Sequence, residues 1–203
     1  MRPPRQIRAR SEDARAALRA EILENGRQLF LQHGYDAVSL RTLAATVGLT
    51  AAALYTYFPG KLALLRAIWA EDLQRLYKRV RGTGRQASLR QQLQTLVRYW
   101  LTHPDMFRVL FLIEDRTPDD GAMFIGSDAA QALIGLIRDA VCAQLPGVAA
   151  KQQQAEFEAL WAAVQGVMTL AILVPEYGWA PARKLVDIQV DAFEARWRDM
   201  ARP

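Results

Sequence analysis

The residues of this chain best suited to chemistry lie between positions 39 and 61, and they offer hydrogen bonding and positive charge. Tyr57 carries a phenol hydroxyl that can donate a hydrogen bond to an anionic backbone. Lys61 stands where a helix is expected to begin, and the free N–H groups of a helix start already favour an anion. A tyrosine and a lysine so placed suit contacts to phosphate groups.

Arg41 and Thr42 stand in the first turn of a short helix that Ser39 can cap. The guanidinium of Arg41 can pair with both acceptors on the major-groove edge of guanine. A plain phosphate contact is an equal alternative for this arginine. Arg41 is therefore the best candidate for reading a base.

A second short helix is expected after Thr50, and it begins with alanines where polar side chains would read bases. Ala51 and Ala52 can pack against a thymine methyl but cannot form a bidentate hydrogen bond. Sequence preference then has to come from Arg41, Thr50, thymine contacts and DNA shape. Tyr55 has two open interpretations, which are packing between helices and touching DNA.

Catalytic and metal-binding chemistry is poorly supported by the residue types present. The chain has 2 histidines and 1 cysteine, and it shows no glycine-rich loop of the kind that cradles phosphates. His103 lies near Asp105 but is expected to cap the helix that follows. The acidic pairs within residues 114–120 are expected to form a solvated loop, since no further cation ligands accompany them. We expect no catalytic residue, no metal site and no cofactor.

Positive charge is concentrated near the N-terminus. The net charge is +5, and residues 1–61 hold 9 Lys and Arg against 5 Asp and Glu. This asymmetry favours a polyanionic partner, although a solvated basic face would give it too. Residues 1–10 hold four arginines and are expected to form a flexible arm, which either lies along DNA or is a disordered leader.

These side chains need a frame that presents them outward, and the stretch from Leu40 to Lys61 predicts a helix-turn-helix. Ala44 is small where two helices must cross closely, and Gly48 suits the positive φ of a turn. Leu54 is the apolar anchor of the second helix. In such a motif the second helix enters the major groove of DNA.

Apolar residues recur with helical spacing along the chain and no strand-like alternation persists, which predicts an all-α protein. A helix is expected from Ser11 to His33, where Gly34 ends it. The predicted organisation is a basic arm at 1–10, a helix-turn-helix DNA-binding domain at 11–60, and a ligand-binding and dimerisation domain at 61–203 that starts with the linking helix 61–81.

One set of residues in unbroken register carries a family resemblance: Ile22, Leu23, Leu29, Phe30, Gly34, Tyr35, Ser39, Leu43, Ala44, Val47, Gly48, Thr50, Leu54, Tyr55, Tyr57, Phe58, Lys61 and Leu64. With these residues the N-terminal third resembles the DNA-binding domain of TetR-type (tetracycline-repressor-like) transcriptional regulators. The resemblance implies a homodimeric all-α protein whose C-terminal domain binds a small molecule. It also implies that Ser39, Thr50, Tyr57 and Lys61 contact phosphates.

Two short strings in the C-terminal part resemble the branch of that family whose C-terminal domain carries a Trp-x-x-x-His-Gly sequence. They are residues 103–108 and the stretch from Trp161 to Gly166, in which Gln165 replaces the histidine. A metal-binding or pH-sensitive role is therefore poorly supported at Gln165. Its amide can still form a hydrogen bond with a ligand.

A cavity with one polar anchor is expected in the C-terminal domain, where it would take an apolar or aromatic effector. For each aromatic residue the competing interpretation is ordinary core packing. The expected lining residues are Trp100, Phe107, Phe111, Phe124, Trp161, Gln165 and Met168.

The last two helices carry apolar stripes that are expected to pair with a second copy across a twofold axis, forming a homodimer. Two DNA-reading helices would then reach half-sites about 34–36 Å apart on a near-palindromic operator. A ligand that moved the linking helix would change this separation, so that ligand and DNA oppose each other. The stripes are Trp161, Val164, Val167, Met168 and Leu170, and Leu185, Ile188, Ala192, Phe193 and Trp197.

The sequence thus predicts a cytoplasmic, ligand-responsive regulator that binds a double-stranded DNA operator and a small-molecule effector, with repression the commonest mode in the family. Activation is an open alternative, and a helical module that touches membranes without reading DNA is a rival of another class. No membrane partner is expected, because the uncharged run between Glu158 and Glu176 is interrupted by polar residues and is short for a span.

Overall fold

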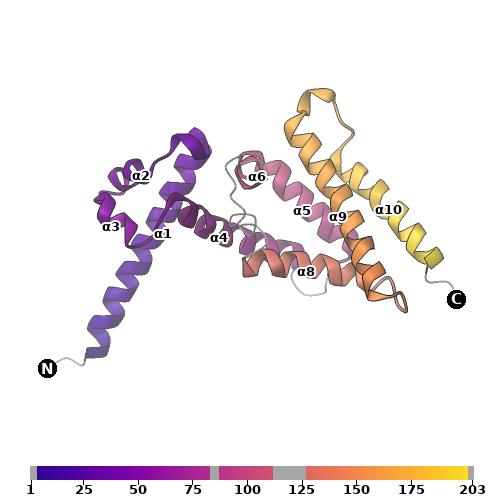
Figure 1. The fold of residues 1–203 in the computed structure, drawn as a ribbon, viewed down its shortest axis with the longest axis horizontal. Helices are drawn as coiled ribbons and strands as arrows, with labels where there is room; N and C mark the ends of the chain where they lie inside the picture. The colour runs from indigo at the N-terminus through magenta and orange to yellow at the C-terminus, as the bar shows by residue number, and fades with distance from the viewer. Residues whose placement is uncertain (1–3, 83–86, 112–126, 201–203) are drawn as a thin grey trace. The chain divides into compact units, whose positions relative to one another are not determined.

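The computed structural model describes residues 4–82, 87–111 and 127–200, and all regular structure in these ranges is helical, which confirms the predicted all-α class (Figure 1). The chain divides into two compact units, Met1–Asp72 and Leu73–Pro203, and this boundary falls inside α4. In chain order the elements are α1 (Pro4–Ala37), α2 (Leu40–Thr46), α3 (Ala51–Tyr55), α4 (Lys61–Arg81), α5 (Leu89–Thr102), α6 (Pro104–Phe111), α8 (Asp128–Cys142), α9 (Ala150–Leu173), the short 3-10 helix η2 (Pro175–Tyr177) and α10 (Ala182–Met200).

Unit 1 is built on the long helix α1. This helix begins at Pro4, whose fixed φ suits the first position of a helix, so residues 4–10 are helical where the sequence predicts a flexible arm. Ile22 and Phe30 turn inward from α1 and are almost completely buried. Gly34 has a φ of 78°, a left-handed value that favours glycine, and the regular helix ends there as predicted.

The predicted helix-turn-helix is present in unit 1 as α2 and α3. Ala44 is 1% exposed, as expected where two helices lie close together, and Gly48 has a φ of 68° in the turn. Leu54 is fully buried and fastens α3, which is only five residues long, against the rest of the unit. Burial of this leucine leaves the opposite side of α3 facing outward.

The helices α1 and α4 cross closely at Gly26. A Cβ atom at this position would lie 3.2 Å from Leu64 Cδ2 and 3.3 Å from Ile68 Cδ1, so the crossing distance depends on glycine. Beside it, Arg27 on α1 and Asp72 on α4 form an ion pair in which Asp72 is 3% exposed. Apolar packing and one buried ion pair therefore hold the same two helices together.

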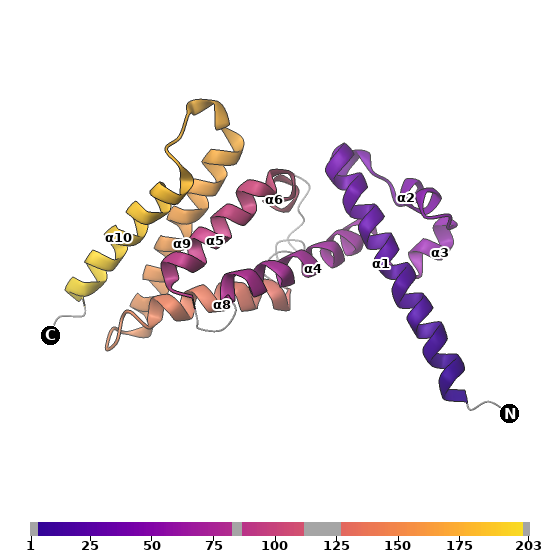
Figure 2. The same ribbon diagram turned by 180° about the vertical axis from the view of Figure 1, so that it is seen from behind.

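Unit 2 is a bundle in which α5 contacts α6, α8, α9 and α10 (Figures 1 and 2). Ser88 begins α5 with a reciprocal capping box to Gln91, and the Ser127 hydroxyl accepts a hydrogen bond from the Ala130 N–H at the start of α8. The core of the bundle is apolar and comes from all four long helices: Leu93, Leu96, Trp100, Leu133, Ile137, Val141, Leu160, Val164, Met168, Val186, Val190 and Trp197.

Two polar networks attach α10 to its neighbours. Glu156 on α9 is 3% exposed, and its carboxylate accepts hydrogen bonds from Arg196 at 2.8 Å and from the Trp197 indole at 3.0 Å. Arg90 on α5 donates to Asp187 at 3.1 Å and to Asp191 at 2.6 Å. Because a buried charge needs partners, the first network ties the register of α10 to that of α9.

The helix α9 is the one described helix that is long and apolar enough to cross a membrane, with a mean hydropathy of 1.3 over its most apolar stretch. It contacts α5, α8 and α10 within unit 2. Its inward face includes Phe157, Leu160 and Ile172, all at most 5% exposed. These contacts are those of the core helix of a bundle.

Candidate nucleic-acid interface and ligand pocket

The two capping residues predicted from the sequence form the local hydrogen bonds expected of them. The Ser39 hydroxyl accepts from the Thr42 N–H at 3.0 Å, and the Thr50 hydroxyl accepts from the Ala53 N–H at 3.2 Å. Both hydroxyl groups satisfy N–H groups that a helix start leaves free. Ser39 and Thr50 thereby fix where α2 and α3 begin, and both remain exposed.

The side chains predicted to read bases lie on the outside of unit 1. Arg41 and Thr42 are exposed at the start of α2, and Ala52 is exposed on α3, next to half-buried Ala51. Tyr55 is 51% exposed, which places it on the surface and not in the core. Of its two interpretations, the structure therefore favours the outward one.

The pair formed by Tyr57 and Phe58 is accompanied by two arginines of α1. The Arg15 guanidinium lies 5.7 Å from the centre of the Tyr57 ring, and that of Arg19 lies 5.2 Å from the centre of the Phe58 ring. Both distances fit cation–π contacts. The four-residue spacing of Arg15 and Arg19 on a helix was the available signal in the sequence, but it did not reveal the aromatic partners.

Lys61 begins α4 as predicted, and its ammonium group lies at the end of α1. Its Nζ atom is 4.0 Å from the centre of the Tyr35 ring and donates to the Asp36 carbonyl at 3.4 Å. Burial lowers the pKa of Lys61, while the charge of Asp36 opposes this change. The side chain is half-buried, so it has to exchange these contacts for a phosphate if it binds one.

Three of the predicted ligand residues form an aromatic cluster in unit 2. The Trp100 ring centre lies 5.8 Å from those of Phe107 and Phe111, and the two phenylalanines are 4.5 Å apart. Trp100 and Phe107 are at most 2% exposed. Such edge-on and tilted pairs are favourable in a core as well as in a binding site.

The other predicted ligand residues are placed differently. Met168 is fully buried, Gln165 is half-buried, and Trp161 is half-buried with its ring centre 6.0 Å from that of Phe157. Phe124 lies outside the described residues. The expected effector cavity therefore stays a prediction.

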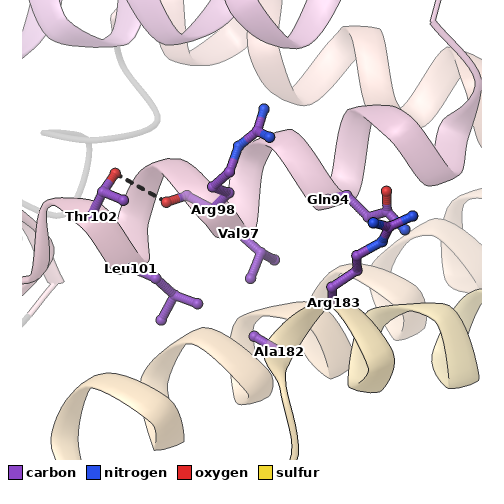
Figure 3. A pocket seen from close by; sticks show the side chains of 7 residues that line it. All are labelled: Gln94, Val97, Arg98, Leu101, Thr102, Ala182 and Arg183. Atoms are coloured by element: carbon purple, nitrogen blue, oxygen red, sulfur yellow. Dashed lines mark hydrogen bonds between the residues drawn. The ribbon is translucent and has the colours of Figure 1, made fainter.

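A pocket lies between α5 and the start of α10, and none of its lining residues was predicted (Figure 3). Its volume is about 290 Å³. No local pattern in the sequence predicts this pocket, because the two helices that meet here are about eighty residues apart along the chain. The lining residues are Gln94, Val97, Arg98, Leu101, Thr102, Ala182 and Arg183.

The apolar stripes predicted for dimerisation are partly used inside unit 2. Val164, Met168 and Trp197 are at most 1% exposed, so these three residues belong to the core of the unit and their assignment to a dimer face was wrong. Leu170 and Ile188 of the same stripes are 44% and 51% exposed. Helical periodicity identified apolar faces but could not tell which element covers each one.

The fold of unit 1 is that of a helix-turn-helix domain, and the second helix of the motif has an exposed side. Residues 22–68 match the model for bacterial regulatory proteins of the tetR family. This match is confined to the N-terminal part of the chain, which holds the helix-turn-helix.

Curated relatives match this chain over about half of its length and about half of their own. The HTH-type transcriptional repressor Rv1474c of Mycobacterium tuberculosis is 33% identical over 97 residues, which cover 48% of each chain. The HTH-type transcriptional repressor AcnR of Corynebacterium diphtheriae is 34% identical over 87 residues, which cover 43% of this chain and 42% of that one. These relatives are named as transcriptional repressors and not as enzymes.

Solved structures share the fold over nearly the whole chain. The putative regulatory protein SCO4313 superposes with a TM-score of 0.66 at 22% identity, covering 95% of this chain and 98% of its own. BioQ bound to its double-stranded DNA operator superposes with a TM-score of 0.59 at 19% identity, covering 87% of this chain and 98% of its own. SmeT in complex with triclosan also superposes with a TM-score of 0.59 at 19% identity, covering 87% of this chain and 91% of its own.

Proposed function

We propose that this chain is a ligand-responsive transcriptional repressor that binds a near-palindromic DNA operator as a homodimer. One observation carries the proposal. In a unit that matches the tetR family, buried Leu54 and the Thr50 cap hold α3 so that Ala52 and Tyr55 face outward. An exposed second helix on a helix-turn-helix is the element that enters the major groove.

The proposed DNA contacts divide into phosphate contacts and base contacts. Ser39, Thr50, Tyr57 and Lys61 hold the DNA backbone, since their donors lie at or beside the ends of helices. The cations of Arg15 and Arg19 beside the Tyr57–Phe58 pair support binding of a polyanion at this edge of unit 1.

Base contacts come from the remaining exposed residues of α2 and α3. Arg41 and Thr42 reach from the first turn of α2, with Arg41 directed either to guanine or to a phosphate. Ala51, Ala52 and Tyr55 offer apolar surface to thymine methyl groups. Since three of these five side chains are apolar or aromatic, DNA shape supplies part of the specificity.

The proposed effector is a small apolar or aromatic molecule that binds in unit 2. The Trp100–Phe107–Phe111 cluster supports this class of ligand, because such rings give large apolar contacts. SmeT, which shares the fold, is known in complex with triclosan. Gln165, at the position where one branch of the family has histidine, is the proposed polar anchor.

The proposed homodimer forms through α9 and α10, which still expose Leu170, Leu173 and Ile188. These three large apolar side chains are each more than 40% exposed, and a second copy would remove them from water. A twofold axis there would present two copies of α3 to half-sites about 34–36 Å apart. Such a protein works beside DNA, so we expect it in the cytoplasm.

The test is a fluorescence anisotropy titration with the DNA upstream of the chain's own coding sequence and with a scrambled duplex of equal length. Tyr57→Phe removes one hydroxyl and Lys61→Ala one cation, and we expect each to weaken binding by up to about tenfold. Lys184→Ala, which removes an exposed lysine from α10, is the matched control. Equal binding of both duplexes, or equal loss in the control, would show that unit 1 does not read this DNA.

A further inference from the structure

We infer that Tyr35 and the backbone carbonyl of Asp36 hold the ammonium group of Lys61 in the free chain, and that a DNA phosphate has to release it from there. Tyr35 thereby sets how much Lys61 adds to the affinity for DNA. The inference rests on the proposed function, in which Lys61 contacts a phosphate, and it names the residue that regulates this contact. All of the residues concerned belong to unit 1.

The position of the Tyr35 ring is determined by its neighbours in the chain. Gly34 has a φ of 78°, so the backbone departs from the helical direction directly before Tyr35. The ring packs against that of Phe30, with 5.7 Å between the ring centres. Phe30 is 4% exposed and belongs to the core of the unit. A ring that rests on a buried partner offers a fixed surface to the side chain that reaches it.

The side chain of Lys61 ends at this ring. Its Nζ atom lies 4.0 Å from the ring centre, within the about 6 Å over which an aromatic ring attracts a cation. The same atom donates to the Asp36 carbonyl at 3.4 Å. An ammonium group has three N–H donors and no acceptor, and both of these contacts direct it to the end of α1.

Loss of water accompanies these contacts. Lys61 is half-buried, and its pKa is lowered chiefly because burial removes water from the ammonium group, while the charge of Asp36 opposes this change. A phosphate that binds the ammonium group replaces the ring and the carbonyl. The apparent affinity for DNA is then reduced by the fraction of chains in which Lys61 is held.

This competition is particular to the lysine. Arg15 and Arg19 also lie over aromatic rings, those of Tyr57 and Phe58. A guanidinium that stacks on a ring keeps the N–H groups at its edge free to donate, because it is planar and has five donors. An ammonium is a compact charge, so its attraction to a ring competes with its attraction to a phosphate.

The test is a double-mutant cycle on DNA affinity, measured by fluorescence anisotropy with the upstream duplex and the scrambled duplex. Tyr35→Leu removes the ring and keeps an apolar side chain, so it should tighten binding of the upstream duplex by roughly 2- to 5-fold. Tyr35→Phe, the matched control, keeps the ring face and should leave the affinity unchanged. In a Lys61→Ala chain, Tyr35→Leu should have no effect, because no ammonium group remains to be released.

A merely structural role of Tyr35 gives a different result. Weaker binding by Tyr35→Leu, or the same effect of Tyr35→Leu with and without Lys61, would overturn the inference. Tighter binding by Tyr35→Phe would also overturn it, since the ring is still present in that variant.

Proton NMR of the unmutated chain tests the contact without a change at Tyr35. The ring current of Tyr35 should shift the ε-methylene protons of Lys61 upfield in the free chain, and the upstream duplex should return them to the ordinary lysine position. Lys61→Ala identifies the signal by removing it. An upfield shift that is absent from the free chain, or that persists in the complex, would contradict the inference. Equal binding of both duplexes would sink the proposed function instead, and the upfield signal of the free chain would remain.

Discussion

Arg41 is the one charged residue within α2 and α3, so the charge that enters the proposed major-groove contact depends on a single side chain. It is exposed, and it stands two residues after the Ser39 cap that fixes the start of α2. An arginine held at a fixed helix start can direct both prongs of its guanidinium at one base.

We expect Arg41→Ala to reduce discrimination at one base pair of the operator. Loss of a bidentate contact to guanine costs about 1–3 kcal/mol for the preferred base and little for the others. Anisotropy titrations against four duplexes that differ at that pair measure this. If Arg41 binds a phosphate instead, affinity falls equally for all four, and the salt dependence decreases by about one counterion.

Glu156 is a buried carboxylate that its hydrogen-bond partners keep ionised. Burial raises the pKa of its carboxyl group, but hydrogen bonds from Arg196, Trp197 and Gln152 outweigh this, and the pKa lies below its ordinary value of 4.5. The ionised form is therefore the one that stabilises the fold. This contribution is complete above pH 4.5 and is lost as the pH falls through the lowered pKa.

Glu156→Ala should lower the free energy of unfolding by about 1–3 kcal/mol at pH 7, because the buried Trp197 N–H loses its acceptor. Glu158→Ala, which changes an exposed glutamate two residues on, should change it by less than about 0.5 kcal/mol. Urea unfolding at a fixed protein concentration measures both. Glu156→Gln should be less stable than the unmutated chain at pH 7, and this difference in the free energy of unfolding should disappear as the pH falls below 4.5. A difference that persists at acid pH would contradict the assignment.

At the scale of elements, two glycines within helices have opposite surroundings. A Cβ at Gly26 on α1 would lie within 3.3 Å of two side chains of α4, whereas a Cβ at Gly166 on α9 would have nothing within 4 Å. The first glycine permits a helix crossing, and the second only lowers helix propensity. Gly26 therefore has a packing role in unit 1, whereas Gly166 has none within unit 2.

Gly26→Leu should lower the free energy of unfolding by about 1–3 kcal/mol, because the α1–α4 crossing has no room for the side chain. Gly166→Ala should raise it by roughly 0.5–1 kcal/mol, since alanine favours a helix. Denaturant unfolding at equal protein concentration compares the two. A stable Gly26→Leu variant would mean that Leu64 and Ile68 can move aside.

At the scale of the whole molecule, the proposed action on two half-sites depends on the exposed apolar residues of α9 and α10. Ile188 is 51% exposed on α10, although its neighbours Val186 and Val190 are fully buried. We propose that Ile188, together with the exposed Leu170 and Leu173 of α9, belongs to an interface between protein copies, since such apolar surface is removed from water there. The proposed operator binding requires such an interface, because a single copy contacts only one half-site.

Ile188→Glu should convert the dimer to a monomer in sedimentation velocity and should weaken operator binding by at least tenfold. A charge placed in an apolar interface costs far more than one placed in water. Ala132→Glu on the exposed face of α8 introduces the same charge elsewhere and should leave the dimer intact. An Ile188→Glu protein that remains dimeric would place the interface on another face.

The sequence by itself determined the helix-turn-helix, including its caps and turns. Ser39 and Thr50 cap helices through hydrogen bonds that span three residues, and Gly34 and Gly48 adopt positive φ for reasons internal to the backbone. Burial of Leu54 follows from periodicity within the motif. All of these features depend on residues close together in the chain, so a pattern of residue types is sufficient to predict them.

Only the tertiary structure decided which surfaces meet. Lys61 approaches Tyr35, Glu156 receives the indole N–H of Trp197, and Arg183 reaches the same pocket as Arg98. Periodicity marks a helix face as apolar or charged, but the same face can be covered by its own chain, by a second copy or by a ligand. The choice among them depends on packing between segments that are far apart in the sequence, and that packing is absent from any local pattern.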